Sequence, residues 1–189
     1  MIRIGILGDM GSGKSYVANN FGYPVFNADN EVSKLYKKNK KIFRKLNKKL
    51  PNHILSFPID KIEVTKAILT NKSNLKKIIK IVHDEVRKKM KLFIKKNKNK
   101  KIVVLDIPLL LENKINNKSD ILVFVESRKE DIEKRIKKRV NFNRRLFNKF
   151  KRIQYSKSYK KRKSDFIIKN DFTKKSVKKG IRSILNKIQ

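Results

Sequence analysis

The residues with the clearest chemical use form a glycine-rich segment near the N-terminus. Residues 8–15 read GDMGSGKS, which has the spacing G-x-x-x-x-G-K-S; an apolar run precedes them and a helix-compatible segment follows. Glycines let the backbone turn tightly and present its N–H groups to a phosphate, and the dipole of a following helix adds positive potential. A lysine at this spacing reaches the β- and γ-phosphates, and the adjacent hydroxyl can ligate Mg²⁺. We therefore predict that Lys14 binds nucleotide phosphates and that Ser15 binds their magnesium ion.

A second candidate is the carboxylate of Asp29, which follows a short apolar run at residues 24–27. Strand ends meet at the ligand crevice of a parallel sheet, where a carboxylate could deprotonate an acceptor hydroxyl. Aspartate is also a common helix N-cap. The residue type alone leaves both roles open.

Several arginines follow the fourth apolar run, among them Arg135, Arg139, Arg144 and Arg145. Arginines carried over the phosphates by a closing segment can neutralise charge that develops during phosphoryl transfer. Basic residues are common throughout this chain, so only their position distinguishes these four. No N-K-x-D motif directly follows one of the expected strands, which disfavours a GTPase.

The elements that must position these groups alternate between short apolar runs and longer helical patterns, which predicts an α/β fold of three layers with a five-stranded parallel sheet. The expected strands are residues 2–7, 24–27, 102–107, 121–125 and 166–168. Residues 34–100 are expected to form a helical insertion and residues 139–159 a lid, all within a single domain, 1–189. Thr173 is the expected N-cap of the last helix.

Composition limits the function further. The chain of 189 residues has 52 Lys and Arg against 16 Asp and Glu, a formal charge of +36, and no cysteine. Such a charge attracts any polyanion. However, the lysines are spread along the whole chain without the interleaved aromatic residues on which bases stack. We therefore expect a cytoplasmic protein with no specific nucleic acid partner and no membrane span, occurring as a monomer or weak oligomer.

Several further motifs resemble those of the dephospho-CoA kinase family, and the likeness covers essentially the whole chain. The family usually has Asp-Ala-Asp where residues 27–29 read NAD, Pro-Leu-Leu-x-Glu where 108–112 read PLLLE, and Ala-Asp-x-x-Ile-x-Asn where 164–170 read SDFIIKN. Gln154 lies between the last two motifs, as in the family.

The resemblance implies transfer of the ATP γ-phosphate, with Mg²⁺, to the ribose 3′-hydroxyl of dephospho-CoA. Asp29 would be the base, Lys14 would hold phosphates, and Arg139 would lie on the lid. The implied ATP-binding residues are Asp9, Met10, Gly11, Ser12, Gly13, Lys14, Ser15, Tyr16 and Asn170, the last towards the adenine. The implied acceptor-binding residues are Lys61, His83, Pro108, Leu109, Leu110 and Glu112.

Some positions depart from the family pattern or allow another role. Asn27 replaces a carboxylate and Lys61 a common arginine, which turns a two-pronged contact into a point charge. His83, apart from the resemblance, is as readily a structural histidine. Asp106 could order a metal-bound water or cap a turn, and Glu112 could contact substrate or pair with a lysine. A nucleoside or nucleotide kinase and a basic nucleic-acid-binding ATPase are the competing functions.

Overall fold

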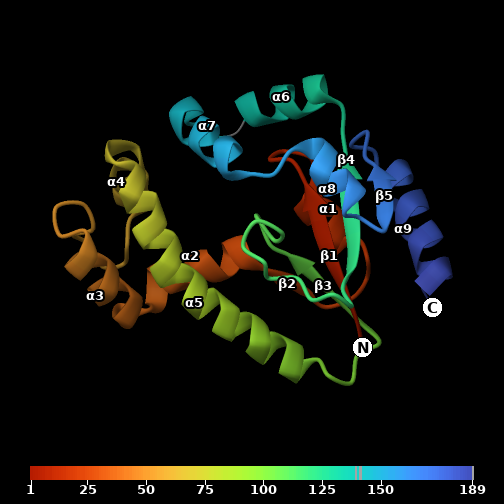
Figure 1. The fold of residues 1–189 in the computed structure, drawn as a ribbon, viewed down its shortest axis with the longest axis horizontal. Helices are drawn as coiled ribbons and strands as arrows, with labels where there is room; N and C mark the ends of the chain where they lie inside the picture. Colours follow the sequence, from red (N-terminus) through yellow and green to blue (C-terminus); the bar gives the residue numbers. More distant parts are fainter. Residues whose placement is uncertain (139, 141, 189) are drawn as a thin grey trace. The chain divides into compact units, whose positions relative to one another are not determined.

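The computed structural model describes residues 1–138, 140 and 142–188, and its central element is a five-stranded parallel sheet (Figure 1). The strands lie in the order β2-β3-β1-β4-β5, and every neighbouring pair is parallel. Their bounds are β1 (Ile2–Gly8), β2 (Val25–Asn27), β3 (Ile102–Asp106), β4 (Ile121–Glu126) and β5 (Phe166–Lys169). The predicted sheet is confirmed, with each strand within one residue of the expected apolar run.

The chain divides into two compact units, and the sheet belongs to the first, which comprises residues 1–27, 97–143 and 149–189. Its helices are α1 (Lys14–Asn19), α6 (Lys129–Lys137), α8 (Lys157–Arg162), α9 (Lys174–Ile188) and the second half of α7 (Arg144–Ile153). Strands covered on both faces are apolar along their whole length, and all of β3 is buried.

Helices α1 and α9 pack on one face of this sheet, and Figure 1 shows α9 beside β5. Their buried side chains form one cluster with those of the strands, including Ile4, Val17, Val123 and Ile181. The hydroxyl oxygen of Thr173 accepts a hydrogen bond from the backbone N–H of Ser176 at 3.2 Å, so the predicted N-cap of α9 is confirmed.

The opposite face of β1 carries the segment that follows β3. A Cβ atom on Gly5 would lie 2.6 Å from Leu110 and 2.9 Å from Leu122, so the absence of a side chain at Gly5 lets both leucines pack against the strand. Helix α8 also packs against β1. At the start of the sheet, Arg3 and Asp120 form an ion pair with an N···O distance of 2.9 Å.

The second unit comprises residues 28–96 and 144–148 and is helical. Its helices are α2 (Ala28–Lys38), α3 (Lys40–Lys49), α4 (Lys61–Thr70) and α5 (Lys72–Lys96), together with the first half of α7. The long α5 packs against α2, α3 and α4, and its buried stripe includes Ile78, Val82, Val86 and Met90. Residues 34–100 are all described and contain no strand, so this part of the chain is helical, as its sequence pattern predicts.

Candidate functional site

The glycine-rich loop leaves the carboxyl end of β1 and enters α1 with a backbone that requires glycine. Gly11 and Gly13 both have φ of 87°, a region that side chains disfavour. A Cβ atom on Gly13 would also lie 2.5 Å from the amide nitrogen of Asn170, and one on Gly11 would lie 2.8 Å from Ile136. The prediction that these glycines permit a tight turn is therefore confirmed.

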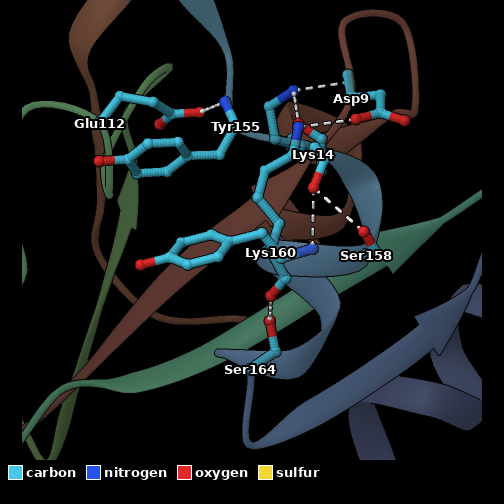
Figure 2. A network of polar contacts seen from close by, with 10 residues as sticks. Asp9, Lys14, Glu112, Tyr155, Ser158, Lys160 and Ser164 are labelled. Atoms are coloured by element: carbon cyan, nitrogen blue, oxygen red, sulfur yellow. Dashed lines mark hydrogen bonds and ion pairs between the residues drawn. The ribbon is translucent and has the colours of Figure 1, made fainter.

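The side chain of Lys14 folds back over the loop from the first turn of α1 (Figure 2). Its ammonium group donates to the backbone carbonyls of Gly8 at 3.1 Å and Asp9 at 2.8 Å. These bonds hold the ammonium group beside the loop backbone, where it can exchange a carbonyl for a phosphate oxygen.

Two buried side chains hold the loop from behind by binding a single carbonyl. The backbone carbonyl oxygen of Ser12 accepts hydrogen bonds from the Ser127 hydroxyl at 3.0 Å and from the Asn170 side-chain amide at 2.8 Å. The carbonyl oxygen of the Asn170 side chain accepts from the backbone N–H of Phe172 at 2.9 Å. Asn170, which is expected towards the adenine, thus contacts the phosphate loop, and so does Ser127, which sequence reasoning missed.

A second lysine reaches the loop from α8, and sequence reasoning missed it as well. Lys160 is 3% exposed, and its ammonium group lies 2.6 Å from a carboxylate oxygen of Asp9. It also lies 3.5 Å from the Gly8 carbonyl oxygen that Lys14 contacts. Figure 2 shows both lysines converging on this part of the loop. In the sequence Lys160 begins a run of four basic residues, 160–163, and nothing in that run marks it out. Only its burial in the folded structure distinguishes it.

A small cavity joins this loop to the segment after β3. Its lining includes Lys14, Lys160, Leu109, Leu110, Glu112 and Gln154. Glu112 accepts a hydrogen bond from the backbone N–H of Tyr155 at 2.8 Å. The structure therefore brings three of the expected acceptor-site residues beside Lys14. Half-buried Pro108, which precedes Leu109, is not part of this lining.

Oxygen ligands suited to magnesium lie at the ends of strands and at the start of α1. Asp106 ends β3, is 3% exposed, and accepts a hydrogen bond from the Asn27 amide at 2.6 Å. Ser15 is exposed. Among the described residues no three His, Asp or Glu side chains gather to hold a metal. Magnesium in kinase sites commonly uses one or two protein oxygens together with phosphates and water, so these residues fit it.

Another cavity, of about 290 Å³, lies along the outer side of the loop and is lined by Gly11, Gly13, Arg135 and Lys138. The guanidinium carbon of Arg135 lies 4.3 Å from the centre of the Phe172 ring. A flat cation and an aromatic ring can both stack on a nucleobase. Arg135, one of the four predicted arginines, thus lies beside the phosphate loop; Arg139 lies outside the described residues, and Arg144 and Arg145 belong to the second unit.

The remaining candidates are exposed or belong to the helical unit. Tyr16 is 43% exposed. Asp29 is exposed in the first turn of α2, which begins at Ala28, so it lies inside the helix and is not its N-cap. Lys61 begins α4 and is exposed. Half-buried His83 lies on α5; burial, and then the nearby Arg87, hold its pKa below its usual value, against the opposing effect of Asp84.

A family model and a sequence relative agree on one family. A family model described as dephospho-CoA kinase matches residues 2–176. A dephospho-CoA kinase of Wolbachia pipientis wMel is 34% identical over 190 residues, covering 98% of this chain and 97% of the relative.

Solved structures show the same fold. TT1252 from Thermus thermophilus aligns with a TM-score of 0.77 at 23% identity, covering 100% of this chain and 98% of the other. A dephospho-CoA kinase from Campylobacter jejuni aligns with a TM-score of 0.62 at 22% identity, covering 99% of this chain and 97% of the other. The family model, the sequence relative and the fold agree with the motifs, and the chain belongs to the dephospho-CoA kinase family.

Proposed function

We propose that this kinase transfers the γ-phosphate of ATP to the ribose 3′-hydroxyl of dephospho-CoA, giving coenzyme A and ADP. The observation that carries the proposal is the cavity in which Lys14 meets Leu109, Leu110 and Glu112. Lys14, the proposed phosphate-binding residue, lines this cavity together with residues of the segment that resembles the family's Pro-Leu-Leu-x-Glu motif. Membership of the dephospho-CoA kinase family supports the same acceptor.

In the proposed reaction, the carboxylate of Asp29 takes the proton of the 3′-hydroxyl. The oxygen then attacks the γ-phosphorus while the bond from that phosphorus to the β,γ-bridging oxygen breaks, and ADP leaves. Lys14 and the loop N–H groups stabilise the charge on the phosphates. We assign Arg139 to the lid over them by resemblance to the family. The other loop positions, Met10 and Tyr16 included, would surround the nucleotide.

We further propose that Mg²⁺ accompanies the nucleotide and is held by Ser15, with Asp106 near the same phosphates. The ion supplies charge neutralisation at the β- and γ-phosphates. Lys61 and His83 would bind the acceptor from the helical unit, and Pro108 would shape the backbone of the segment that carries the acceptor motif. Arg135 would stack on the adenine, and Asn170 would lie towards the same base while its amide binds the loop.

The wider organisation is also a proposal. We infer that the two compact units act as a single kinase domain with a lid near residues 139–159. We propose a cytoplasmic monomer or weak oligomer with no specific nucleic acid partner. In the part of the chain that the structure describes, no helix has the length and apolar character of a membrane span.

The test is ADP release from ATP and Mg²⁺ at physiological salt, compared among dephospho-CoA, AMP, CMP, RNA and no acceptor. We expect release with dephospho-CoA alone, together with a product that has the mass of coenzyme A. Turnover with AMP or CMP in its place would reassign the acceptor to a nucleotide. Release that RNA stimulates without a phosphorylated small molecule would make the chain a nucleic-acid-dependent ATPase.

A further inference from the structure

The buried lysine of α8 sets that short helix apart from an ordinary basic surface. Lys157 and Lys161, on the same helix, are about half exposed (48% and 43% of the side chain) and pair with Glu126. The side chain of Lys160 is only 4% exposed and points to Asp9 in the phosphate loop. Burying an ammonium group costs free energy unless the group is paired and hydrogen-bonded, and the contact with Asp9 offsets this cost for Lys160.

The ion-pair partner of Lys160 is Asp9, a carboxylate in the loop that is predicted to bind phosphates. Asp9 is the second residue of the phosphate loop, and its side chain is 36% exposed. A negative charge there repels the phosphates that the loop is built to bind. Pairing with Lys160 neutralises it. The ion pair therefore cancels the charge of the Asp9 carboxylate while no nucleotide is bound, and the positive charge of Lys14 remains beside the loop.

The two lysines also share a contact. The ammonium groups of Lys14 and Lys160 both reach the carbonyl oxygen of Gly8, at 3.1 and 3.5 Å. Both side chains line the same small cavity. A triphosphate that draws Lys14 from this carbonyl thus comes within reach of the second ammonium group.

Local hydrogen bonds hold Lys160 in place. The Ser156 side chain accepts from the backbone N–H of Tyr159 at 3.2 Å at the start of α8. At its end, the Ser164 hydroxyl donates to the backbone carbonyl of Lys160 at 2.7 Å. Because α8 also packs against β1, the lysine is presented to the loop from a fixed backbone.

We propose that Lys160 is a second phosphate-binding lysine, and that Asp9 holds its ammonium group until the phosphates of a nucleoside triphosphate displace the carboxylate. This inference rests on the proposed function only in requiring that the loop bind a triphosphate. The carboxylate and the phosphates compete for one cation. Asp9 and Lys160 should therefore affect nucleotide affinity in opposite directions.

The experiment measures dissociation constants of ATP and AMP by calorimetry, without acceptor, for the wild type, Lys160→Met, Asp9→Asn and the double variant. Lys161→Met is the matched control, since it removes the same charge one residue away. We expect Lys160→Met to weaken ATP binding about 10- to 100-fold, the range for losing a charge-assisted hydrogen bond, while AMP binding changes less. We expect Asp9→Asn to tighten ATP binding about 2- to 5-fold, the size of a partly exposed ion pair. When Lys160 is already replaced by Met, adding Asp9→Asn should tighten ATP binding much less than it does in the wild type.

Wild-type affinity for ATP in Lys160→Met, or an equal loss in Lys161→Met, would overturn a specific role for Lys160. Weaker ATP binding in Asp9→Asn would overturn the displacement and make the pair a structural clamp. Asp9 is partly exposed, so its variant tests the idea even where Lys160→Met fails to fold. Wild-type protein that binds ATP but does not phosphorylate dephospho-CoA would refute the proposed acceptor, and the ATP affinities would still decide the role of Lys160.

Discussion

Replacing Asn170 with alanine removes two hydrogen bonds that brace the phosphate loop. The amide of this side chain donates to the Ser12 carbonyl at 2.8 Å and accepts from the Phe172 N–H at 2.9 Å. Asn170 itself is 3% exposed. A hydrogen bond of this kind contributes about 1 kcal/mol. We therefore expect Asn170→Ala to lose about 2 kcal/mol of stability, which for a chain of this length lowers Tm by about 4–8 °C.

The Ser12 carbonyl keeps one donor in this variant, because Ser127 still binds it at 3.0 Å. Ser127→Ala alone removes a single hydrogen bond and should cost about 1 kcal/mol. The double variant leaves a carbonyl of a fully buried residue without either donor. An unsatisfied buried group adds a desolvation cost of about 1–3 kcal/mol, so the two substitutions together should cost more than their sum.

The assay is urea or thermal unfolding of the four proteins, each with and without ATP. Nucleotide should raise Tm less in Asn170→Ala than in the wild type, because the loop must be ordered when ATP binds. Asn20→Ala is the matched control: its amide also donates to a backbone carbonyl, that of Tyr16 at 2.8 Å, but at an exposed site. Additive losses, or an Asn170 variant as stable as the control, would refute the argument that the two side chains share one carbonyl.

Four other substitutions test the remaining assignments. Lys14→Ala should weaken ATP binding about 10-fold or more, whereas Asp29→Asn should keep ATP binding and lose about 10²- to 10⁴-fold in kcat; calorimetry and steady-state rates check both, and near wild-type turnover would remove Asp29 from the role of base. Arg3→Met removes the ion-pair partner of Asp120, whose side chain is 0% exposed. We expect this to lower the free energy of unfolding by about 3–5 kcal/mol and to leave kcat unchanged at low temperature. A loss below about 1 kcal/mol would contradict this expectation. Hydrogen bonds from Ser176 and Thr173 lower the pKa of Asp171 to about 2. The ionised carboxylate therefore stabilises the fold above the ordinary pKa of 3.8, and this stabilisation is lost as the pH falls towards 2. Asp171→Asn should flatten the pH dependence of the urea midpoint between these two values, and an unchanged slope would contradict this.

Much of the fold follows from local patterns in the sequence. Short apolar runs predicted each of the five strands, and those at 102–107 and 121–125 are nearly continuous because a strand covered on both faces can carry few polar residues. The glycine-rich spacing predicted the loop because Gly11 and Gly13 need positive φ, a local property of the backbone. The helical nature of residues 34–100 and the N-cap Thr173 follow from equally local rules.

Contacts between distant residues decided the rest of the site. Ser127 and Asn170 are 115 and 158 positions from Ser12, and Lys160 is 151 positions from Asp9. The sequence showed the residue types but not which of many lysines is buried, because burial depends on how α8 packs against β1. Periodicity and the glycine-rich motif thus determined the strands and the loop, which rest on short-range sterics and patterning, and the resemblance of further motifs gave the family. Only the tertiary structure could select Lys160 from its basic neighbours, since desolvation of a charge is a property of the folded surroundings.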